Sequence, residues 1–395
     1  MNICGIVCEY NPFHRGHAWQ IGEIRRRLGE ETGILCVMSG DFVQRGEAAA
    51  FEKHARARAA VIGGADLVVE LPLPWCVSSA EGFAKGGVEL LGAAGIMTHL
   101  AFGSECGNLN ALAETAELLL RPELDGEIRS GLREGLSYAA ARQRGAERLR
   151  GHALPELTRP NDILALEYLK ALKTQKLSVE PLAIPRRGAA HDSAEESAFL
   201  SASELRGRFR AGEDIADLLP EGVWAALSGD CAAADSDRLE TALLSRLRFL
   251  PQEAFAVLPD VSEGLENRLY AAVRTAPTPD ALLDAASAKR YPRARLRRML
   301  LCAALGVRAE DKQGSPPYLR VLAANARGLE LLRLTKDRCT LPVVTKPSAV
   351  RELGTEAERI FRLGAEANDL YRLCLPEESA RIGDSDWRTG PAIVK

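Results

Sequence analysis

The chain has 395 residues, of which 46% are hydrophobic and 27% charged, and its formal net charge is −3. This composition is typical of a globular protein with two or three domains of about 150 residues each. The small net charge excludes a protein that coats nucleic acid with its whole surface. No segment approaches the roughly 18 consecutive apolar residues of a membrane span, and the N-terminus lacks the features of a signal peptide. We therefore expect a cytoplasmic protein without membrane contact.

Nine cysteines are scattered over the whole length of the chain. None stands in a C-x-x-C pair, and no cluster of cysteine and histidine has the spacing of a zinc site. We therefore expect neither a disulfide framework nor a structural metal.

The first two hundred residues alternate strand-like and helix-like patterns. Apolar runs predict strands over residues 2–9, 33–38, 66–70, 98–102 and 178–184, whereas helical periodicity predicts helices over residues 17–28, 52–62, 78–91, 109–120 and 201–209. Such alternation is typical of a parallel sheet with right-handed crossovers. Ligands of these sheets bind beyond the carboxyl ends of the strands, so the segments that follow each strand are the candidates for a site.

Beyond residue 211 the alternation stops and the chain reads as helical. The expected fold is therefore α/β, with an N-terminal Rossmann-like domain over residues 1–210 that contains a parallel sheet, followed by a mostly α-helical C-terminal domain over residues 211–395.

Charge is segregated within this second part. Residues 211–285 carry 14 acidic and 5 basic side chains, whereas residues 286–351 carry 15 basic and 4 acidic ones. The segment KRYPRARLRR places six cations in ten residues: Lys289, Arg290, Arg293, Arg295, Arg297 and Arg298. Such a block is either a solvated helix face or a contact for an anionic partner. We favour RNA as that partner.

The most informative segment follows the first predicted strand. There Asn11-Pro12-Phe13 leads into His14-Arg15-Gly16-His17, which opens a helix. The glycine permits close approach of a ligand to the backbone, and the helix N-terminus supplies free N–H groups to phosphate oxygens. The two imidazoles can stabilise the charge that grows as pyrophosphate leaves. The alternative is a loop with two unrelated histidines, but the position after the first strand favours a triphosphate site.

The H-x-G-H motif after strand one resembles the signature of the HIGH nucleotidyltransferases and of class I aminoacyl-tRNA synthetases. A synthetase should also carry a K-M-S-K-S loop, which this sequence lacks. Nucleotidyltransferases instead have a serine-rich turn into a helix with an arginine, and residues 200–206 read LSASELR. The resemblance predicts that Ser201, Ser203 and Arg206 face the phosphates. An ordinary capped helix is the alternative for this segment.

Several further segments narrow the resemblance: EYNPFHRGH, MSGDFVQRGE, GADLVVELP, AFGSE and RPND occur in this order. Together they resemble the tRNA(Met) cytidine acetate ligase family. The resemblance is strong over residues 1–210 and continues through EGLENRL and AKRYPRARLRR. It implies an enzyme that activates acetate with ATP as acetyl-adenylate. The acetyl group then passes to the wobble cytidine of elongator tRNA(Met). Magnesium would accompany the ATP phosphates.

The same resemblance implies the roles of particular residues. His14 and His17 would be catalytic, acting on the phosphates, and the basic block 289–298 would bind tRNA. The implied ATP contacts are Val7, Cys8, Glu9, Tyr10, Asn11, Pro12, Phe13, His14, Arg15, Gly16, His17, Ala18, Trp19, Gln20, Gly103, Asn161, Arg186, Ser203 and Arg206. Arg187 adjoins Arg186, and either of the two fits the motif.

Other polar residues also follow predicted strands. Asp41, Gln44 and Arg45 come after the second strand and are candidates for substrate contact, while Glu70 and Glu105 end the third and fourth strands. Two other functions stay open: a nucleotidyltransferase acting on a small phosphorylated acceptor, and a non-catalytic RNA-binding protein. The long basic extension argues against the first, and the intact histidine motif argues against the second.

Overall fold

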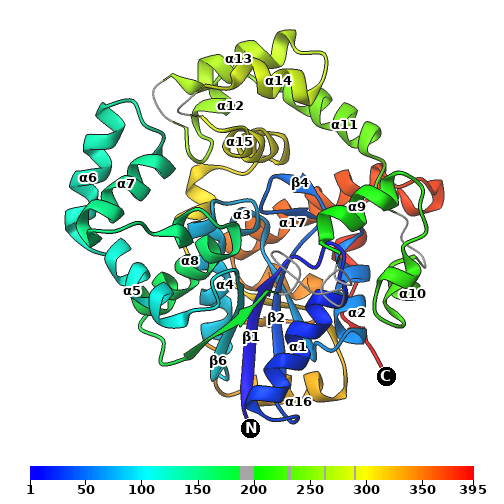
Figure 1. Cartoon of the computed structure of the whole chain (residues 1–395). Coiled ribbons are helices and arrows are strands. Elements are labelled where there is room, and N and C mark those ends of the chain that lie inside the picture. The colour runs from blue at the N-terminus through cyan, green and yellow to red at the C-terminus, as the bar shows by residue number, and fades with distance from the viewer. Residues whose placement is uncertain (187–199, 229–232, 262–263, 289–290) are drawn as a thin grey trace.

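The fold is built around one central sheet (Figure 1). A computed structural model describes residues 1–186, 200–228, 233–261, 264–288 and 291–395. The strand order is β10-β8-β5-β2-β1-β6-β7, with β9 paired to β8. The bounds are β1 Ile3–Cys8, β2 Gly33–Ser39, β5 Leu67–Leu71, β6 His99–Ser104, β7 Glu180–Pro185, β8 Leu319–Ala324, β9 Val343–Val344 and β10 Ala392–Ile393. A separate hairpin joins β3 (Phe42–Val43) to β4 (Glu47–Ala48).

All five strands that the sequence predicted are present and pair in parallel. Successive side chains of a strand point to opposite faces, and each face is covered by its own apolar cluster. In β1, Ile3 contributes to one cluster, whereas Cys4 and Ile6 contribute to the other. Because the strands run in parallel, their carboxyl ends meet at a single edge of the sheet.

Helices cover both faces of the sheet (Figure 1). One face is covered by α1 (Arg15–Leu28), α2 (Lys53–Ile62), α9 (Ala202–Arg210) and α10 (Val223–Ser228). The other face is covered by α3 (Leu73–Cys76), α4 (Ala80–Ala93), α5 (Leu109–Leu119), α8 (Pro160–Thr174), α16 (Ala326–Thr335) and α17 (Thr355–Leu373). The antiparallel pair α6 (Pro122–Arg133) and α7 (Tyr138–Arg150) projects from this side with a small core of its own. The α/β fold expected from the sequence is confirmed.

The chain beyond residue 211 is mostly helical, as predicted, but it also returns to the sheet. Five of its helices lie above the carboxyl edge of the sheet (Figure 1): α11 (Ser236–Phe249), α12 (Glu253–Ala256), α13 (Leu265–Thr275), α14 (Pro279–Ala286) and α15 (Arg293–Leu305). After them, β8 pairs antiparallel with β5 and brings β9 and β10 into the sheet. The sequence did not predict these strands, although LRVLAA is apolar apart from Arg320. The segment is short, and such a run fits a buried helix equally well.

A buried ionic cluster joins this returning segment to the N-terminal half. The Lys53 ammonium lies 2.8 Å from Glu70 Oε1 and 2.6 Å from Asp386 Oδ2. The Arg320 guanidinium lies 2.9 Å from Glu70 and 2.7 Å from Asp386. All four side chains are at most 8% exposed, so each charge depends on its partners for the stabilisation that water would otherwise give.

No helix in the described ranges combines the length and the hydrophobicity needed to cross a membrane.

Candidate functional site

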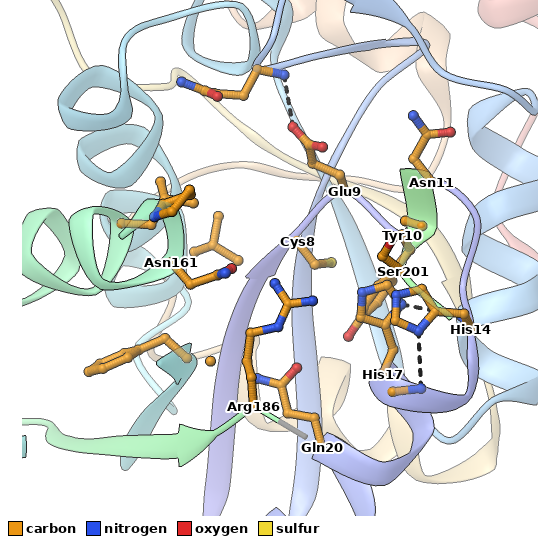
Figure 2. Close-up of a pocket in the computed structure, with 18 of the residues that line it drawn as sticks. Cys8, Glu9, Tyr10, Asn11, His14, His17, Gln20, Asn161, Arg186 and Ser201 are labelled. Carbon is orange, nitrogen blue, oxygen red and sulfur yellow. Dashed lines mark hydrogen bonds between the residues drawn. The ribbon is translucent and has the colours of Figure 1, made fainter. Parts of the chain in front are cut away.

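A cavity of about 650 Å³ opens at the carboxyl edge of the sheet, between α8, α9 and the β3–β4 hairpin. Its polar lining comes from the ends of β1, β6 and β7 and from the starts of α1, α8 and α9, and Figure 2 shows part of it. The histidine rings lie on one side of Cys8 and Asn161 lies on the other, with Glu9 toward one end and Arg186 toward the opposite end. The site is therefore where a parallel sheet places its ligand.

The two histidines form a stacked pair at the start of α1. Their ring centroids are 3.7 Å apart. The His14 Nδ1 atom accepts a hydrogen bond from the Gly16 N–H at 3.0 Å, and the His17 Nδ1 atom accepts one from the His14 N–H at 3.2 Å. This reciprocal arrangement is a capping box, in which two side chains satisfy the free N–H groups of the first helical turn.

These bonds decide where the imidazole protons reside. Because each Nδ1 atom accepts a backbone N–H, each neutral ring carries its proton on Nε2. Burial, with Arg186 and Arg206 nearby, lowers the pKa of His14 to about 4. Burial, with His14 and Arg186 nearby, lowers the pKa of His17 well below its usual value. In the free protein at neutral pH, the pair therefore offers two uncharged N–H donors, and arginines supply the positive charge.

The structure gives a second reason, besides close approach of a ligand, why position 16 requires glycine. A Cβ atom at this position would lie 2.9 Å from His14 Cε1 and 3.1 Å from His14 Nδ1. Any larger residue would therefore displace the His14 ring, so the glycine in the motif fixes the histidine pair.

Two arginines reach the cavity from distant parts of the chain. Arg186 follows β7, and its backbone N–H donates to Ser104 O at 2.9 Å. Arg206 lies on α9, and its guanidinium donates to Asn11 O at 2.7 Å. Ser201 caps α9 by accepting the Glu204 N–H at 3.2 Å. The second predicted motif is therefore a capped helix that also lines the cavity with Ser201, Ser203 and Arg206.

The Asn161 side chain is held by a carboxylate at the end of β6. Glu105 Oε1 accepts bonds from the backbone and side-chain nitrogens of Asn161, at 3.2 and 2.5 Å. The carboxylate of Asp162, the next residue, accepts from Ser104 Oγ at 2.5 Å and from the Glu105 N–H at 2.9 Å. Glu105 therefore orients Asn161 and is itself outside the cavity lining.

The opposite wall contains a carboxylate. Glu9 directly follows β1 and lines the cavity, and its Oε1 atom accepts the Gln44 N–H at 2.9 Å. Burial raises the pKa of Glu9 above its usual value, against the lowering effects of the Gln44 N–H and of nearby arginines. Gln44 and Arg45 belong to the turn between β3 and β4 and also line the cavity. Both were substrate-contact candidates in the sequence.

Most of the residues that the resemblance implied as ATP contacts come together here. Fifteen of them line the cavity: Val7, Cys8, Glu9, Tyr10, Asn11, His14, Gly16, His17, Trp19, Gln20, Gly103, Asn161, Arg186, Ser203 and Arg206. Pro12, Phe13, Arg15 and Ala18 do not. The Phe13 side chain is fully buried in the core. Arg15 is exposed and donates to Asp217 O at 2.6 Å.

Two candidates from other strands lie elsewhere. The Asp41 carboxylate accepts from the Lys53 N–H and from Asn368 Nδ2, both at 2.8 Å, and Glu70 belongs to the buried ionic cluster. Neither side chain lines the cavity, so both lie apart from Gln44 and Arg45, which do line it. Arg187 lies outside the described residues.

Sequence reasoning missed the apolar wall of the cavity. Phe83, Phe102, Leu164 and Tyr168 line it from α4, β6 and α8. In the sequence these residues fit the ordinary apolar period of their elements, which carries no signal of a ligand. Within the described chain, no group of three or more His, Cys, Asp or Glu side chains is arranged to hold a metal ion.

Much of the basic block on α15 is engaged within the protein. Arg293 forms ion pairs with Asp280 and Asp284, and Arg297 forms one with Glu47 of β4. Its remaining described members are half-buried: Arg295, whose guanidinium donates to a backbone carbonyl, and Arg298. Lys289 and Arg290 lie outside the described residues.

With this geometry in view, comparisons with known proteins identify the family. The family model of the HIGH Nucleotidyl Transferase matches residues 1–386. The chain is 34% identical to the tRNA(Met) cytidine acetate ligase of Syntrophomonas wolfei over 99% of both chains. It is 37% identical to the enzyme of the same name from Syntrophotalea carbinolica, over 89% of this chain and 86% of that one.

Two solved structures agree with these relatives. The structure of Thermotoga maritima TmcAL bound with alpha-thio ATP superposes with a TM-score of 0.91 at 30% identity, and the apo form with 0.92 at 29%. Both cover the whole of either chain. The chain belongs to the HIGH nucleotidyltransferase family, and within it to the family of the tRNA(Met) cytidine acetate ligases.

Proposed function

We propose that this protein is an ATP-dependent ligase that acetylates the wobble cytidine of elongator tRNA(Met), giving N4-acetylcytidine. Its substrates are ATP, acetate and the tRNA. The observation that carries the proposal is the stacked His14–His17 pair at a helix start, facing a cavity that arginines also line. The names of the relatives, and the alpha-thio ATP in the Thermotoga maritima structure, support ATP and tRNA as substrates.

The first step forms acetyl-adenylate. An acetate oxygen attacks the α-phosphorus of ATP, and pyrophosphate leaves. The Nε2–H groups of His14 and His17 donate to phosphate oxygens, while Arg186 and Arg206 balance the charge that develops on pyrophosphate. Magnesium accompanies the ATP phosphates as part of that substrate. Asn161, which lies across Cys8 from the histidine rings, suits the adenosine, as does Gly103 of the cavity lining.

The second step transfers the acetyl group to the cytidine amine and releases AMP. Activation is required because free acetate is a poor acyl donor and the cytosine amine is a weak nucleophile. Positioning of the two reactants supplies most of the acceleration in such a reaction. The apolar wall of Phe83, Leu164 and Tyr168 excludes water, which would hydrolyse the adenylate.

We propose that the tRNA lies across the α15 side of the cavity mouth. The basic block was the sequence-based candidate for this contact. Of its described members, Arg295 and Arg298 form no ion pair within the described residues, and we propose that they keep that role. Arg293 contributes little, since Asp280 and Asp284 already balance its charge. Arg45 is exposed at the cavity and, in the described part of the chain, forms no ion pair. It is therefore available to a tRNA phosphate.

The test uses the purified protein with labelled acetate, ATP and elongator tRNA(Met), followed by nucleoside mass spectrometry. The expected product is N4-acetylcytidine at the wobble position, formed only when ATP and acetate are both present. Transfer of AMP or CMP to a small acceptor would instead identify an ordinary nucleotidyltransferase. Binding of tRNA without any product would identify a non-catalytic RNA-binding protein.

A further inference from the structure

We propose that Glu9 is the general base of acetyl transfer, accepting a proton from the cytidine N4 amine as that amine attacks the acetyl carbonyl. The inference rests on the proposed function and gives Glu9 a role on the cytidine side of the cavity rather than the ATP side. It follows from the position of the carboxylate, its hydrogen bonds and the division of charge within the cavity.

The phosphate-binding Arg186 and the Glu9 carboxylate lie toward opposite ends of the cavity, and Arg206 and Arg45 are close enough to Glu9 to lower its pKa against the effect of burial. Arg186 and the two N–H donors of the histidine pair make one end suitable for phosphates. Glu9 lies toward the other end in Figure 2, with Cys8 between it and Arg186 and the histidine rings beside Arg186. A carboxylate beside phosphate oxygens would be repelled, because like charges at close range disfavour binding. The Glu9 end therefore suits a group that donates hydrogen bonds.

The hydrogen bonds of Glu9 leave it free to act as an acceptor. Oε1 accepts a single backbone N–H, from Gln44. Arg56, the arginine buried beneath, donates instead to the Glu9 main-chain carbonyl, and its other N–H groups bond to Phe51 O and Ser39 O. Throughout the described residues, no cation forms an ion pair with the Glu9 carboxylate. It is thus held in place by one bond and remains available to a ligand.

Cytosine supplies the matching group. Its N4 amine donates hydrogen bonds, and carboxylates of Glu and Asp accept from it in nucleic-acid recognition. The same amine becomes acidic as it attacks an acyl group, so a carboxylate in contact with it can take the proton. Burial raises the pKa of Glu9, which brings its basicity closer to neutral pH.

Atoms and electrons balance in this step. The N4 lone pair forms a C–N bond to the acetyl carbonyl carbon, and the C–O bond between the acetyl group and the α-phosphate breaks. AMP leaves with that electron pair, and one N4 proton passes to the Glu9 carboxylate, which later releases it to water. No oxidant, reductant or further reactant is needed.

The variant Glu9→Gln separates this role from ATP binding, since the amide oxygen can still accept the Gln44 N–H. We expect acetate-dependent ATP–pyrophosphate exchange to fall by a much smaller factor than acetyl transfer. Single-turnover transfer from preformed acetyl-adenylate to tRNA should fall about 10²- to 10⁴-fold. Glu9→Asp should recover part of that loss. Glu89→Gln is the matched control, because Glu89 is a half-buried carboxylate of α4 outside the cavity whose pKa burial also raises.

The pH profile is the second readout. In the original protein the transfer rate should fall on the acidic side as Glu9 becomes protonated, and this limb should disappear in Glu9→Gln. Loss of exchange and transfer by the same factor would overturn the inference and make Glu9 part of ATP binding. Transfer within a few-fold of the original rate would overturn it as well. If the original protein makes no N4-acetylcytidine, the proposed function itself fails.

Discussion

Arg297 on α15 forms an ion pair with Glu47 on β4, and this contact joins the basic helix to the hairpin that lines the cavity. Gly46, in the turn between β3 and β4, packs against the backbone of the same helix. A Cβ atom there would lie 2.9 Å from Arg298 N. The neighbouring Gln44 donates its N–H to Glu9. A tRNA that rests on α15 would therefore contact the element that positions the cavity wall.

The ion pair between Arg297 and Glu47 predicts what happens when the two charges are exchanged. Arg297→Glu should slow acetyl transfer, because two facing carboxylates would push the hairpin away from α15. The double variant Arg297→Glu with Glu47→Arg should recover much of the rate. A double-mutant cycle on the transfer rate should give a coupling free energy of at least about 0.5 kcal/mol. Additive effects of the two changes would contradict the coupling.

The His17→Ala variant should lose adenylate formation. Removing one donor that stabilises developing charge costs about 10²- to 10³-fold in rate. Acetate-dependent ATP–pyrophosphate exchange measures this step without tRNA. Exposed His152 provides a control, because His152→Ala removes an imidazole far from the motif in the sequence. Exchange within a few-fold of the original rate in His17→Ala would remove His17 from the catalytic machinery.

The histidine pair should stay neutral over the physiological pH range. The pKa of His14 is lowered to about 4, so the free protein should keep the Nε2–H tautomer of His14 from pH 8 down to about pH 5. Nitrogen-15 NMR of the imidazoles reports both the tautomer and the titration. A His14 ring that gains its proton near the unshifted value of 6.5 would contradict the buried, arginine-flanked geometry.

Gly16 and Gly22 both lie in α1, but their replacement by alanine should affect different properties. Gly16→Ala should lower activity, whereas Gly22→Ala should raise stability. At Gly16 the new methyl group meets the His14 ring, so exchange activity should fall at least tenfold while the protein stays folded. At Gly22 nothing lies within 4 Å of the added Cβ. There alanine should raise the free energy of unfolding by about 0.5–1 kcal/mol with activity unchanged. Urea unfolding and pyrophosphate exchange measure the two effects.

Arg45 should matter more for tRNA affinity than Arg293 does. Arg45→Gln removes a cation without an ion-pair partner in the described structure, whereas Arg293→Gln frees two aspartates that it had balanced. For every phosphate that the variant no longer neutralises, the salt dependence of binding should flatten by roughly 0.9 log units for duplex backbone or 0.7 for single strands. Filter binding at several salt concentrations measures the slope. A larger effect of Arg293→Gln would contradict this ranking.

The sequence predicted the parts of the site that depend on local pattern. The H-x-G-H turn, the strand before it and the capped helix at Ser201 can each be predicted from a few neighbouring residues, and they lie where expected. The sequence did not predict the role of a residue whose contacts come from distant parts of the chain. Asp41 follows a strand as Gln44 does, yet its carboxylate turns to Asn368, which is 327 residues away. The sequence alone suggests that Arg293 is a free cation, because its ion pairs with Asp280 and Asp284 form only in the folded protein.

The buried ionic cluster has a consequence for how the protein is made. Lys53 and Glu70 come early in the chain, but Arg320 and Asp386 come late, and Asp386 lies close to the C-terminus. Leaving one buried charge without its partner costs about 3–5 kcal/mol. During synthesis on the ribosome, the sheet behind the cavity therefore carries uncompensated charges until Arg320 and Asp386 have emerged. Full stability should arrive only once Asp386 has joined the cluster, so a nascent chain that ends before Asp386 should remain sensitive to proteases.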